Sequence, residues 1–281
     1  MVAYNAPDHI AACLQRIADT AAGLPHEVLL VDNGDGSAEQ IARRDFPHVR
    51  IVTSQGNIGY GAGNNLLARD ATGDILLIIN PDAFLAENSL HELTRAIRSN
   101  QQVAAFAANL VENDGSPSPE NRILQPGLWQ TFLLALGLWK ASPPSPPQQD
   151  SALSPITAAS GACFAIRKDW WDRLGGFDEK FFLYFEEVDL WLRLAKQGGM
   201  LTRVPHFIVA HDTGTGQRHS ITRRQAYLRG YMTYCRKHFG PVGTWLCGAA
   251  IWLFALRTSL IEHGIEGISA TMPRHWWRGW T

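Results

Sequence analysis

The sequence lacks several features that define common classes of protein. Its formal net charge is −1, so it lacks the basic excess of a general nucleic-acid binder, and we expect no nucleic-acid partner. Its four cysteines are scattered and show no metal-ligand spacing, which indicates buried or free thiols in a reducing compartment. No internal repeat is visible. The first residues are too polar and too short for a secretory signal, so we expect a cytoplasmic location.

No apolar run is long enough to span a bilayer either. The uncharged stretch from Pro241 to Leu256 falls short of the about 20 residues that a transmembrane helix needs. Basic residues interleaved with tyrosines precede it between His219 and His238, and Trp276, Trp277 and Trp280 follow it. This combination favours peripheral association with a membrane interface. The alternative is a helix packed on the rest of the chain or in a dimer contact.

The first hundred residues alternate short apolar runs with helix-like stretches. Continuous apolar runs fit strands buried on both faces of a parallel sheet. The expected strands are 27–32, 49–53 and 74–80, and the expected helices are 9–22, 38–44 and 62–71. Such alternation predicts βαβ units and a doubly wound α/β fold. Ligands bind such sheets at the carboxyl ends of the strands, where Asp32 and Asp82 stand.

A proline-rich region interrupts this pattern. Residues 116–119 and 141–149 are loop segments that flank a short apolar piece, residues 128–139. Proline at this density prevents regular hydrogen bonding. Two interpretations stay open: a flap that binds part of a substrate, or an inert surface insertion.

An acidic block follows at residues 175–193, where a glycine turn leads through an aromatic run into a helical pattern. Its first turn carries the carboxylates Glu186, Glu187 and Asp189. Acids are favoured there by the helix dipole and are commonly structural. Aromatic neighbours, however, exclude water and strengthen the electrostatics of a carboxylate beside them. The aromatic density therefore favours an active site.

Two further segments carry turn chemistry. Residues 57–65 form a glycine-rich turn that enters a helix, where backbone can approach a ligand and helix N-termini favour anions. A dinucleotide fingerprint fails because its third glycine would be Asn64 counted from Gly59, or Leu66 counted from Gly61. Asn80-Pro81-Asp82 follows an apolar run and, by itself, is a common strand-ending turn.

Together these blocks resemble glycosyltransferase family 2. The acidic block, Gly-Gly-Phe-Asp-Glu and then Phe-Phe-Leu-Tyr-Phe-Glu-Glu-Val-Asp-Leu, is similar to that of its rhamnosyltransferase-like members, although their usual Asp is Glu187 here. Further similar blocks are residues 31–34, 57–65 and 80–83. The resemblance extends from Tyr4 to about Gly216. Family members open with a longer apolar strand, so either this sequence starts late or its first strand is unusually short.

The resemblance implies an α/β fold of the GT-A type, with a Rossmann-like, mostly parallel sheet flanked by helices and a helical C-terminal tail. The expected catalytic domain is residues 1–216. Its parts are a nucleotide half at 1–115, the proline-rich insertion at 116–150 and an acceptor half at 151–216. Residues 217–281 form the helical tail.

The resemblance also implies roles for individual residues. Glu187 would be the general base, with Glu186 beside it, and Asp189 and Tyr184 would contact the acceptor. Asp82 and His211 would bind Mg²⁺ or Mn²⁺, although a lone histidine is more often structural. Asn80 replaces the first acid of the usual Asp-x-Asp motif, so metal affinity without the donor should be weak. Residues expected to bind the donor are Tyr4, Asn5, Asp32, Asn57, Gly59, Asn64, Asn80 and Asp82. For Asp32 alone, a turn-capping role is the alternative.

The implied function is an inverting, metal-dependent transfer of a sugar from a nucleotide-diphosphate sugar to a glycan or lipid-linked acceptor of the cell surface, on the inner face of the cytoplasmic membrane. Rhamnose is the leading donor sugar. A glycoside hydrolase is disfavoured because Glu186 and Glu187 are adjacent on a helix and diverge, whereas hydrolases need two carboxylates across one bond. A non-catalytic nucleotide-sugar-binding protein and a membrane scaffold are the alternatives, motivated by Asn80 and Glu187.

Overall fold

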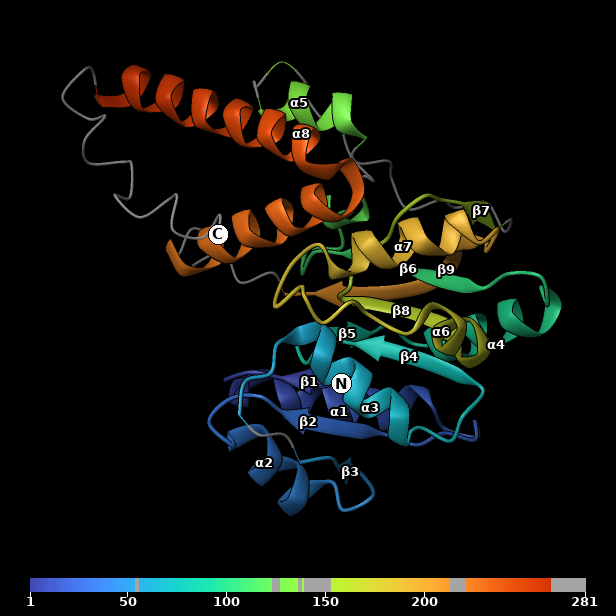
Figure 1. Cartoon of the computed structure of the whole chain (residues 1–281). Helices are drawn as coiled ribbons and strands as arrows, with labels where there is room; N and C mark the ends of the chain where they lie inside the picture. Colours follow the sequence, from blue (N-terminus) through green and yellow to red (C-terminus); the bar gives the residue numbers. More distant parts are fainter. Residues whose placement is uncertain (54–55, 123–126, 136–137, 139–152, 213–220, 264–281) are drawn as a thin grey trace. The chain divides into compact units, whose positions relative to one another are not determined.

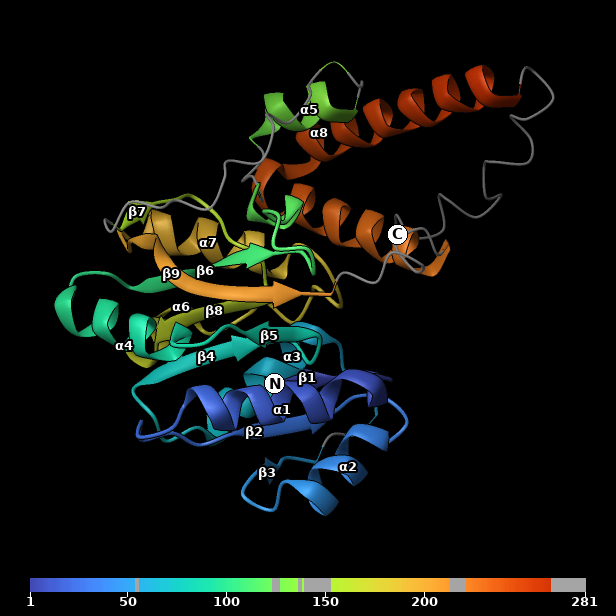
Figure 2. The same cartoon turned by 180° about the vertical axis from the view of Figure 1, so that it is seen from behind.

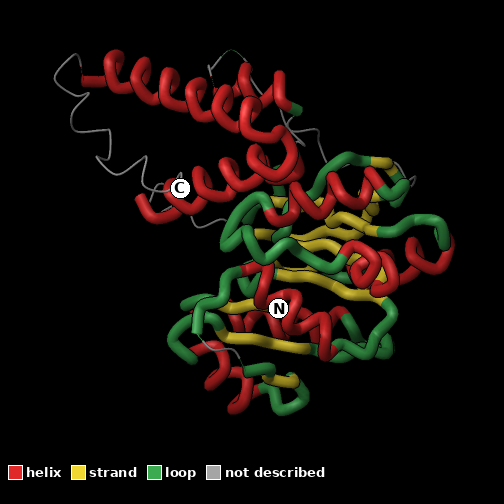
Figure 3. The backbone as a smooth tube through the Cα atoms, viewed as in Figure 1, coloured by secondary structure: helices red, strands yellow, loops and turns green. Residues whose placement is uncertain are grey.

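The computed structural model describes residues 1–53, 56–122, 127–135, 138, 153–212 and 221–263 (Figure 1). The chain forms two compact units, one of Met1–Gln125 with Pro143–Gly230 and one of Pro126–Ser142 with Tyr231–Thr281. The proline-rich region is divided between these units, and the domain bounds expected from the sequence stay predictions. Figure 3 shows the strands in the first unit and only helices in the described part of the second.

The first unit opens with a parallel three-stranded sheet. Its strands are β1 (Val2–Ala3), β2 (Leu29–Asp32) and β3 (Arg50–Ile51), in that order. Helices α1 (Pro7–Thr20) and α2 (Ser37–Asp45) connect them, which confirms the βαβ pattern. Val2 pairs with Val31 and Ala3 with Asp32, so the polar residues that follow β1 and β2 reach the same edge.

A mixed six-stranded sheet forms the rest of this unit. Its order is β4 (Ile75–Ile79), β8 (Cys163–Arg167), β6 (Ala105–Val111), β9 (Leu201–His211) and β5 (Ala83–Leu85), and β7 (Ser154–Pro155) also pairs with β9. Only β6 and β9 are parallel in this sheet, and the other pairs are antiparallel. The continuous apolar runs therefore predicted buried strands correctly. They did not predict whether neighbouring strands would be parallel or antiparallel.

Helices cover both faces of the six-stranded sheet. Along β6, Phe106, Ala108 and Leu110 belong to one apolar cluster, whereas Ala105 and Ala107 belong to another, because successive side chains point to opposite faces. The first cluster includes residues of α1 and α4 (Ser89–Ser99), and the second includes residues of α6 (Lys168–Leu174) and α7 (Glu186–Lys196). Figure 2 shows α1 and α4 from behind. The acidic block is thereby fixed on the second face.

Aromatic packing anchors α7 to the sheet. Trp191 is 1% exposed, and its ring meets that of Phe164 on β8 edge to face, with the centroids 4.7 Å apart. Its indole Nε1 donates a hydrogen bond to the Ala159 carbonyl at 2.8 Å. Phe177 packs edge to face on Trp171 of α6 at 5.1 Å. Such rigid, fully packed rings hold the N-terminus of α7 in one position.

The second unit contains α5 (Leu128–Ala135) and most of α8 (Ile221–His263). The chain kinks within α8 at Gly240, whose φ of 68° is left-handed, and Pro241 follows without a backbone N–H to donate. The expected helical tail is confirmed. Among the described residues, we find no helix that is both long enough and apolar enough to cross a membrane.

Candidate active site

The acidic block enters α7 through two strained residues. Tyr184 and Phe185 have φ angles of 70° and 71°, a left-handed conformation that non-glycine residues rarely adopt. Each such residue costs on the order of 1–3 kcal/mol, and such strain is typical of functional sites. The sharp turn places Glu186 and Glu187 at the first two positions of α7.

The two glutamates point to different neighbours. A Cβ placed on Gly61 of α3 (Tyr60–Asp70) would lie 3.7 Å from the Cβ of Glu186, so Glu186 faces this helix. A Cβ placed on Gly161 would lie 3.9 Å from the Cβ of Glu187. Glu187 thus faces the loop before β8, and the divergence expected of adjacent helical residues is observed.

Burial changes the acidity of both glutamates. Burial, reinforced by the charge of Glu120, raises the pKa of Glu187 to about 7. Burial and the neighbouring charge of Glu187 raise the pKa of Glu186 well above its ordinary value. Glu186 is 4% exposed, and its Oε2 has no hydrogen-bond partner in the structure. Near neutral pH, Glu187 can therefore exchange a proton, whereas burial favours the protonated form of Glu186.

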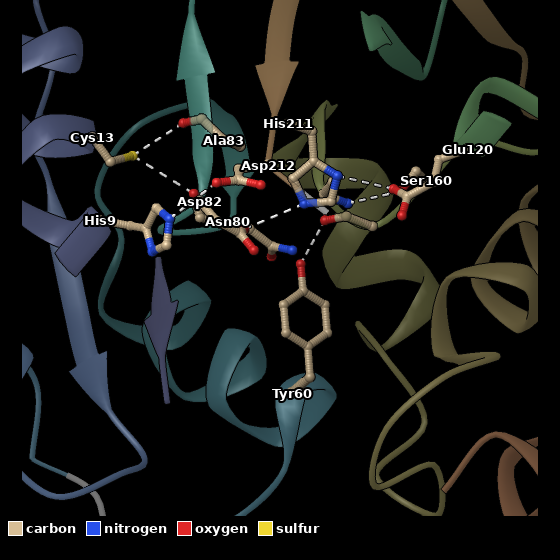
Figure 4. Close-up of polar contacts among 12 residues, drawn as sticks. His9, Cys13, Tyr60, Asn80, Asp82, Ala83, Glu120, Ser160, His211 and Asp212 are labelled. Carbon is tan, nitrogen blue, oxygen red and sulfur yellow. Dashed lines mark hydrogen bonds and ion pairs between the residues drawn. The ribbon is translucent and has the colours of Figure 1, made fainter. Parts of the chain in front are cut away.

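A second cluster forms where β4 and β9 end (Figure 4). His211 is buried between two carboxylates: its Nε2 lies 3.3 Å from Asp82 Oδ1, and its Nδ1 lies 3.1 Å from Glu120 Oε2. Burial alone would lower the pKa of His211, but hydrogen bonds and charges from Asp82 and Glu120 outweigh it and raise this pKa to about 10. These contacts favour the protonated imidazole while no metal is bound, and a metal on Nε2 would take the place of the proton there.

The residues of this cluster fit part of a divalent metal site. Asp82 and His211 offer a carboxylate and an imidazole, and the buried Oδ1 of Asn80 has no hydrogen-bond partner in the structure. Among the described residues, no group of three or more His, Cys, Asp or Glu side chains could hold a metal alone. Mg²⁺ and Mn²⁺ commonly take one or two carboxylates and complete their shell with substrate phosphates and water. The site thus fits a metal that arrives with a diphosphate.

Among the residues expected to bind the nucleotide, Asn5 and Asp32 form hydrogen bonds with nearby backbone amides. Tyr4 is 58% exposed. Asn5 has a left-handed φ of 47°, and its Oδ1 accepts from the Asp35 amide at 3.1 Å. The Asp32 carboxylate accepts from the backbone amides of Gly34, Ala38 and Glu39 at 2.8–3.1 Å. The turn-capping role is therefore observed for Asp32, and its contact with a nucleotide base stays a prediction.

The glycine-rich turn contacts the acidic block. Gly59 has a φ of 88°, and an added Cβ would lie 2.6 Å from the carbonyl oxygen of Phe182. That same carbonyl accepts the Tyr60 amide at 3.0 Å. Asn57 Oδ1 accepts from the Gly59 amide, and buried Asn64 donates to the Tyr60 carbonyl. In this structure the glycine permits close contact between two chain segments, and its expected role in donor binding stays a prediction.

The two residues expected at the acceptor differ in accessibility. Asp189 is 0% exposed, and its carboxylate accepts from Arg193 Nε at 2.7 Å. Arg193 also donates to the carbonyls of Leu174 and Gly176, so this ion pair fastens the acidic block internally. Tyr184 is partly exposed, and its ring lies 5.9 Å from that of Tyr227. Tyr184 can therefore reach a ligand, whereas Asp189 acts within the fold.

The sequence did not single out two residues of the site, although Tyr60 lies within the glycine-rich turn. Glu120 lies in the proline-rich region, on the short 3₁₀ helix η1 (Pro119–Arg122). Its carboxylate accepts from Ser160 Oγ at 3.1 Å, across 40 positions of sequence. Tyr60 donates its hydroxyl to the Gly161 carbonyl at 2.6 Å, beside Glu187. Only the three-dimensional fold brings these residues to the acidic block.

Fold and site together define a glycosyltransferase of the GT-A type. The mannosyltransferase PcManGT from Pyrobaculum calidifontis, solved with GDP-Man and Mn²⁺, matches with a TM-score of 0.59 at 16% identity over 96% of this chain and 76% of that one. GalNAc-T7, solved with UDP, GalNAc and Mn²⁺, matches with a TM-score of 0.60 at 15% identity over 94% of this chain and 57% of that one. These likenesses confirm the fold.

Sequence comparison identifies the family. Residues 1–175 match the model of glycosyl transferase family 2, and residues 146–280 match that of glycosyl transferase family group 2. The chain belongs to glycosyl transferase family 2, whose members are inverting enzymes.

Curated relatives include rhamnosyltransferases. N-acetylglucosaminyl-diphospho-decaprenol L-rhamnosyltransferase of Mycobacterium tuberculosis is 30% identical over 76% of each chain. The low-salt glycan biosynthesis hexosyltransferase Agl10 of Haloferax volcanii is 25% identical over 81% of this chain and 71% of its own. The predicted rhamnosyltransferase-like membership is thereby confirmed, and the non-catalytic alternatives are not favoured.

Proposed function

We propose that this glycosyltransferase moves rhamnose from a nucleotide-diphosphate sugar to a lipid-linked glycan, with Glu187 as the general base. The placement of Glu187 carries the proposal. It stands on a strained helix N-terminus, faces the loop before β8, and lies within electrostatic reach of Glu120 in the second cluster. The names of the curated rhamnosyltransferases support the sugar and the acceptor class.

In the proposed reaction, the Glu187 carboxylate accepts the proton of the acceptor hydroxyl as that oxygen attacks the anomeric carbon. The bond from this carbon to the diphosphate breaks on the opposite face, so the anomeric configuration inverts. Glu186, whose pKa burial raises, supports the turn against α3. Tyr184 provides an aromatic surface beside the acceptor.

The donor is held at the ends of β1, β2 and β4. Tyr4, Asn5 and Asp32 face the nucleoside, and Asn57, Gly59 and Asn64 shape the loop beside it. Asn80, Asp82 and His211 hold the diphosphate end together with Mg²⁺ or Mn²⁺. When bound, the cation supplies positive charge that neutralises the departing diphosphate.

A donor panel tests the proposed function. The full chain is incubated with dTDP-rhamnose and other nucleotide sugars, with Mn²⁺ or Mg²⁺ and membranes that carry lipid-linked acceptors. Metal-dependent turnover with dTDP-rhamnose is the expected result. Nucleotide binding without turnover of any donor would instead support the non-catalytic alternative.

The pH dependence of the reaction follows from Glu187. Because the base must be ionised and its pKa is raised to about 7, kcat/KM should rise as pH increases through about 7 and then level off. Glu92→Gln is the control: it removes the ion pair between Glu92 and Arg95 on α4 and should leave the pH profile unchanged. A profile that levels off near pH 4–5, the ordinary range of a glutamate, would contradict this assignment.

We also propose that the second unit associates peripherally with the inner face of the cytoplasmic membrane. Trp129 on α5 is 68% exposed and Trp245 on α8 is 64% exposed. A Cβ added to Gly243 would lie 3.3 Å from Leu128 Cδ1, so α5 and α8 pack closely within this unit. Exposed aromatic and basic side chains favour a lipid interface that contains anionic lipid.

Vesicle cosedimentation tests this association. Replacing Trp129 and Trp245 with Ala should weaken binding to anionic vesicles by about tenfold or more, because each buried large side chain contributes about 1.5–3 kcal/mol. Met200→Ala, which removes an exposed apolar side chain from the first unit, is the matched control and should bind as the wild type does. If the double variant binds vesicles as tightly as the wild type does, Trp129 and Trp245 do not contact the membrane.

A further inference from the structure

His211 is fixed by a carboxylate that no sequence motif indicates. Glu120 Oε2 lies 3.1 Å from Nδ1 of the buried His211 ring, while Nε2 on the far side of the ring lies 3.3 Å from Asp82. Figure 4 shows the ring between these two side chains. One carboxylate therefore faces each nitrogen of the imidazole.

The Glu120 carboxylate is itself held in place. Ser160 is 9% exposed and donates its hydroxyl to Glu120 Oε2 at 3.1 Å. The same hydroxyl accepts the Ala162 amide at 3.2 Å, and the Ala162 carbonyl accepts the Asn80 amide at 2.9 Å. The support of Glu120 thus continues into the backbone that carries Asn80.

The next residue fixes the backbone of Glu120. Asn121 accepts the Leu110 amide at 2.9 Å and donates to the Leu110 carbonyl at 2.7 Å. Arg203 donates to the Asn121 carbonyl at 2.7 Å. Because Leu110 and Arg203 belong to β6 and β9, η1 is fastened directly to the sheet that carries His211. These hydrogen bonds hold the backbone beside Glu120 against the strands.

We propose that Glu120 is a positioning residue for metal binding: it holds the His211 ring at Nδ1, so that Nε2 faces a divalent cation shared with Asp82. This inference rests on the proposed function. A histidine that binds a metal through one nitrogen commonly donates its other N–H to a carboxylate, which fixes the tautomer and ring orientation. Glu120 lies 3.1 Å from Nδ1 and Asp82 lies on the Nε2 side of the ring, which are the positions that this arrangement requires.

A purely structural role for Glu120 makes a different prediction. Burying a carboxylate opposes folding unless its partners offset the lost hydration, so buried ion pairs contribute little net stability. Glu120→Gln keeps the side-chain shape and an oxygen that can accept from Nδ1. A positioning role predicts weaker metal binding by Glu120→Gln whatever the change in Tm, and still weaker binding by Glu120→Ala. A structural role predicts a loss of Tm without a specific loss of metal affinity.

Titration of the full chain with Mn²⁺ in the presence of saturating dTDP tests the inference. Calorimetry should give a Mn²⁺ Kd about 10–100-fold higher for Glu120→Gln than for the wild type. Pulsed electron paramagnetic resonance of the bound Mn²⁺ should detect a nitrogen coupling from His211 in the wild type and lose it in Glu120→Ala. Glu92→Gln is the charge-matched control and should bind Mn²⁺ as the wild type does.

The outcomes separate this inference from the proposed function. Wild-type Kd values and nitrogen coupling in both Glu120 variants would overturn the positioning role while leaving the transferase intact. If the wild type binds Mn²⁺ without any nitrogen coupling, His211 is not a ligand, and the role of Glu120 is overturned with it. If the wild type binds no Mn²⁺ with dTDP, the metal dependence in the proposed function fails first.

Discussion

Glu187→Gln should lower kcat by about 10²–10⁴-fold, the usual contribution of a general base. The amide preserves the size of the side chain but cannot accept the acceptor's proton. Because the donor is held by other residues, its Kd should stay close to the wild-type value. Steady-state turnover and calorimetric donor binding measure the two quantities separately.

Glu186→Gln is the matched control for this substitution. Burial raises the pKa of Glu186 well above its ordinary value and favours its neutral form, which the amide matches in size. Its effect on kcat should be far smaller than that of Glu187→Gln. Glu187→Asp, which introduces the acid usual in the family, should retain more turnover than Glu187→Gln. A larger loss of kcat in Glu186→Gln than in Glu187→Gln would identify Glu186, and not Glu187, as the general base.

Asp82→Ala should abolish metal-dependent donor binding and lower kcat/KM by at least about 100-fold, as for the loss of one preorganised electrostatic contact. Asp82 supplies the only carboxylate that we assign to both the metal and the diphosphate end. The substitution also leaves Nε2 of His211 without its carboxylate neighbour. Donor titrations at several Mn²⁺ concentrations should show that added metal rescues the variant only partly.

Asp74→Asn provides the control for this second substitution. Asp74 is exposed and lies just before β4, whereas Asp82 follows the end of that strand, so the same charge is removed at opposite ends of one element. This variant should keep wild-type kcat/KM. Equal donor affinity in Asp82→Ala and Asp74→Asn would show that Asp82 does not hold the diphosphate end.

The strongest sequence signals were local, and these predicted the fold well. Apolar runs at 27–32 and 74–80 became β2 and β4, and the helical pattern after Glu186 became α7. Each element depends on its own periodicity and burial. The direction of a strand relative to its neighbour does not depend on these local features. The six-stranded sheet therefore has mostly antiparallel pairs, although continuous apolar runs are typical of parallel sheets.

Site residues that belong to a sequence motif could be predicted. Those that reach the site only through contacts in the folded chain could not. The acidic block identified Glu187, but only the structure shows which of two adjacent glutamates faces the loop before β8. Glu120 lay in a proline-rich region with two open interpretations, and its role depends on Ser160 and His211, both far along the chain. Asp189 was assigned from its place in the motif; the structure shows its carboxylate accepting from Arg193 inside the fold, and its contact with the acceptor stays a prediction.

The anomeric configuration of the transferred sugar is the measurement that tests the central claim most directly. The product formed by the wild-type enzyme from its preferred donor is examined by NMR, with Glu187→Gln run in parallel. Direct attack by a hydroxyl that Glu187 deprotonates predicts an inverted linkage from the wild type and almost none from the variant. A linkage that retains the donor's configuration, or undiminished product from Glu187→Gln, would contradict the account.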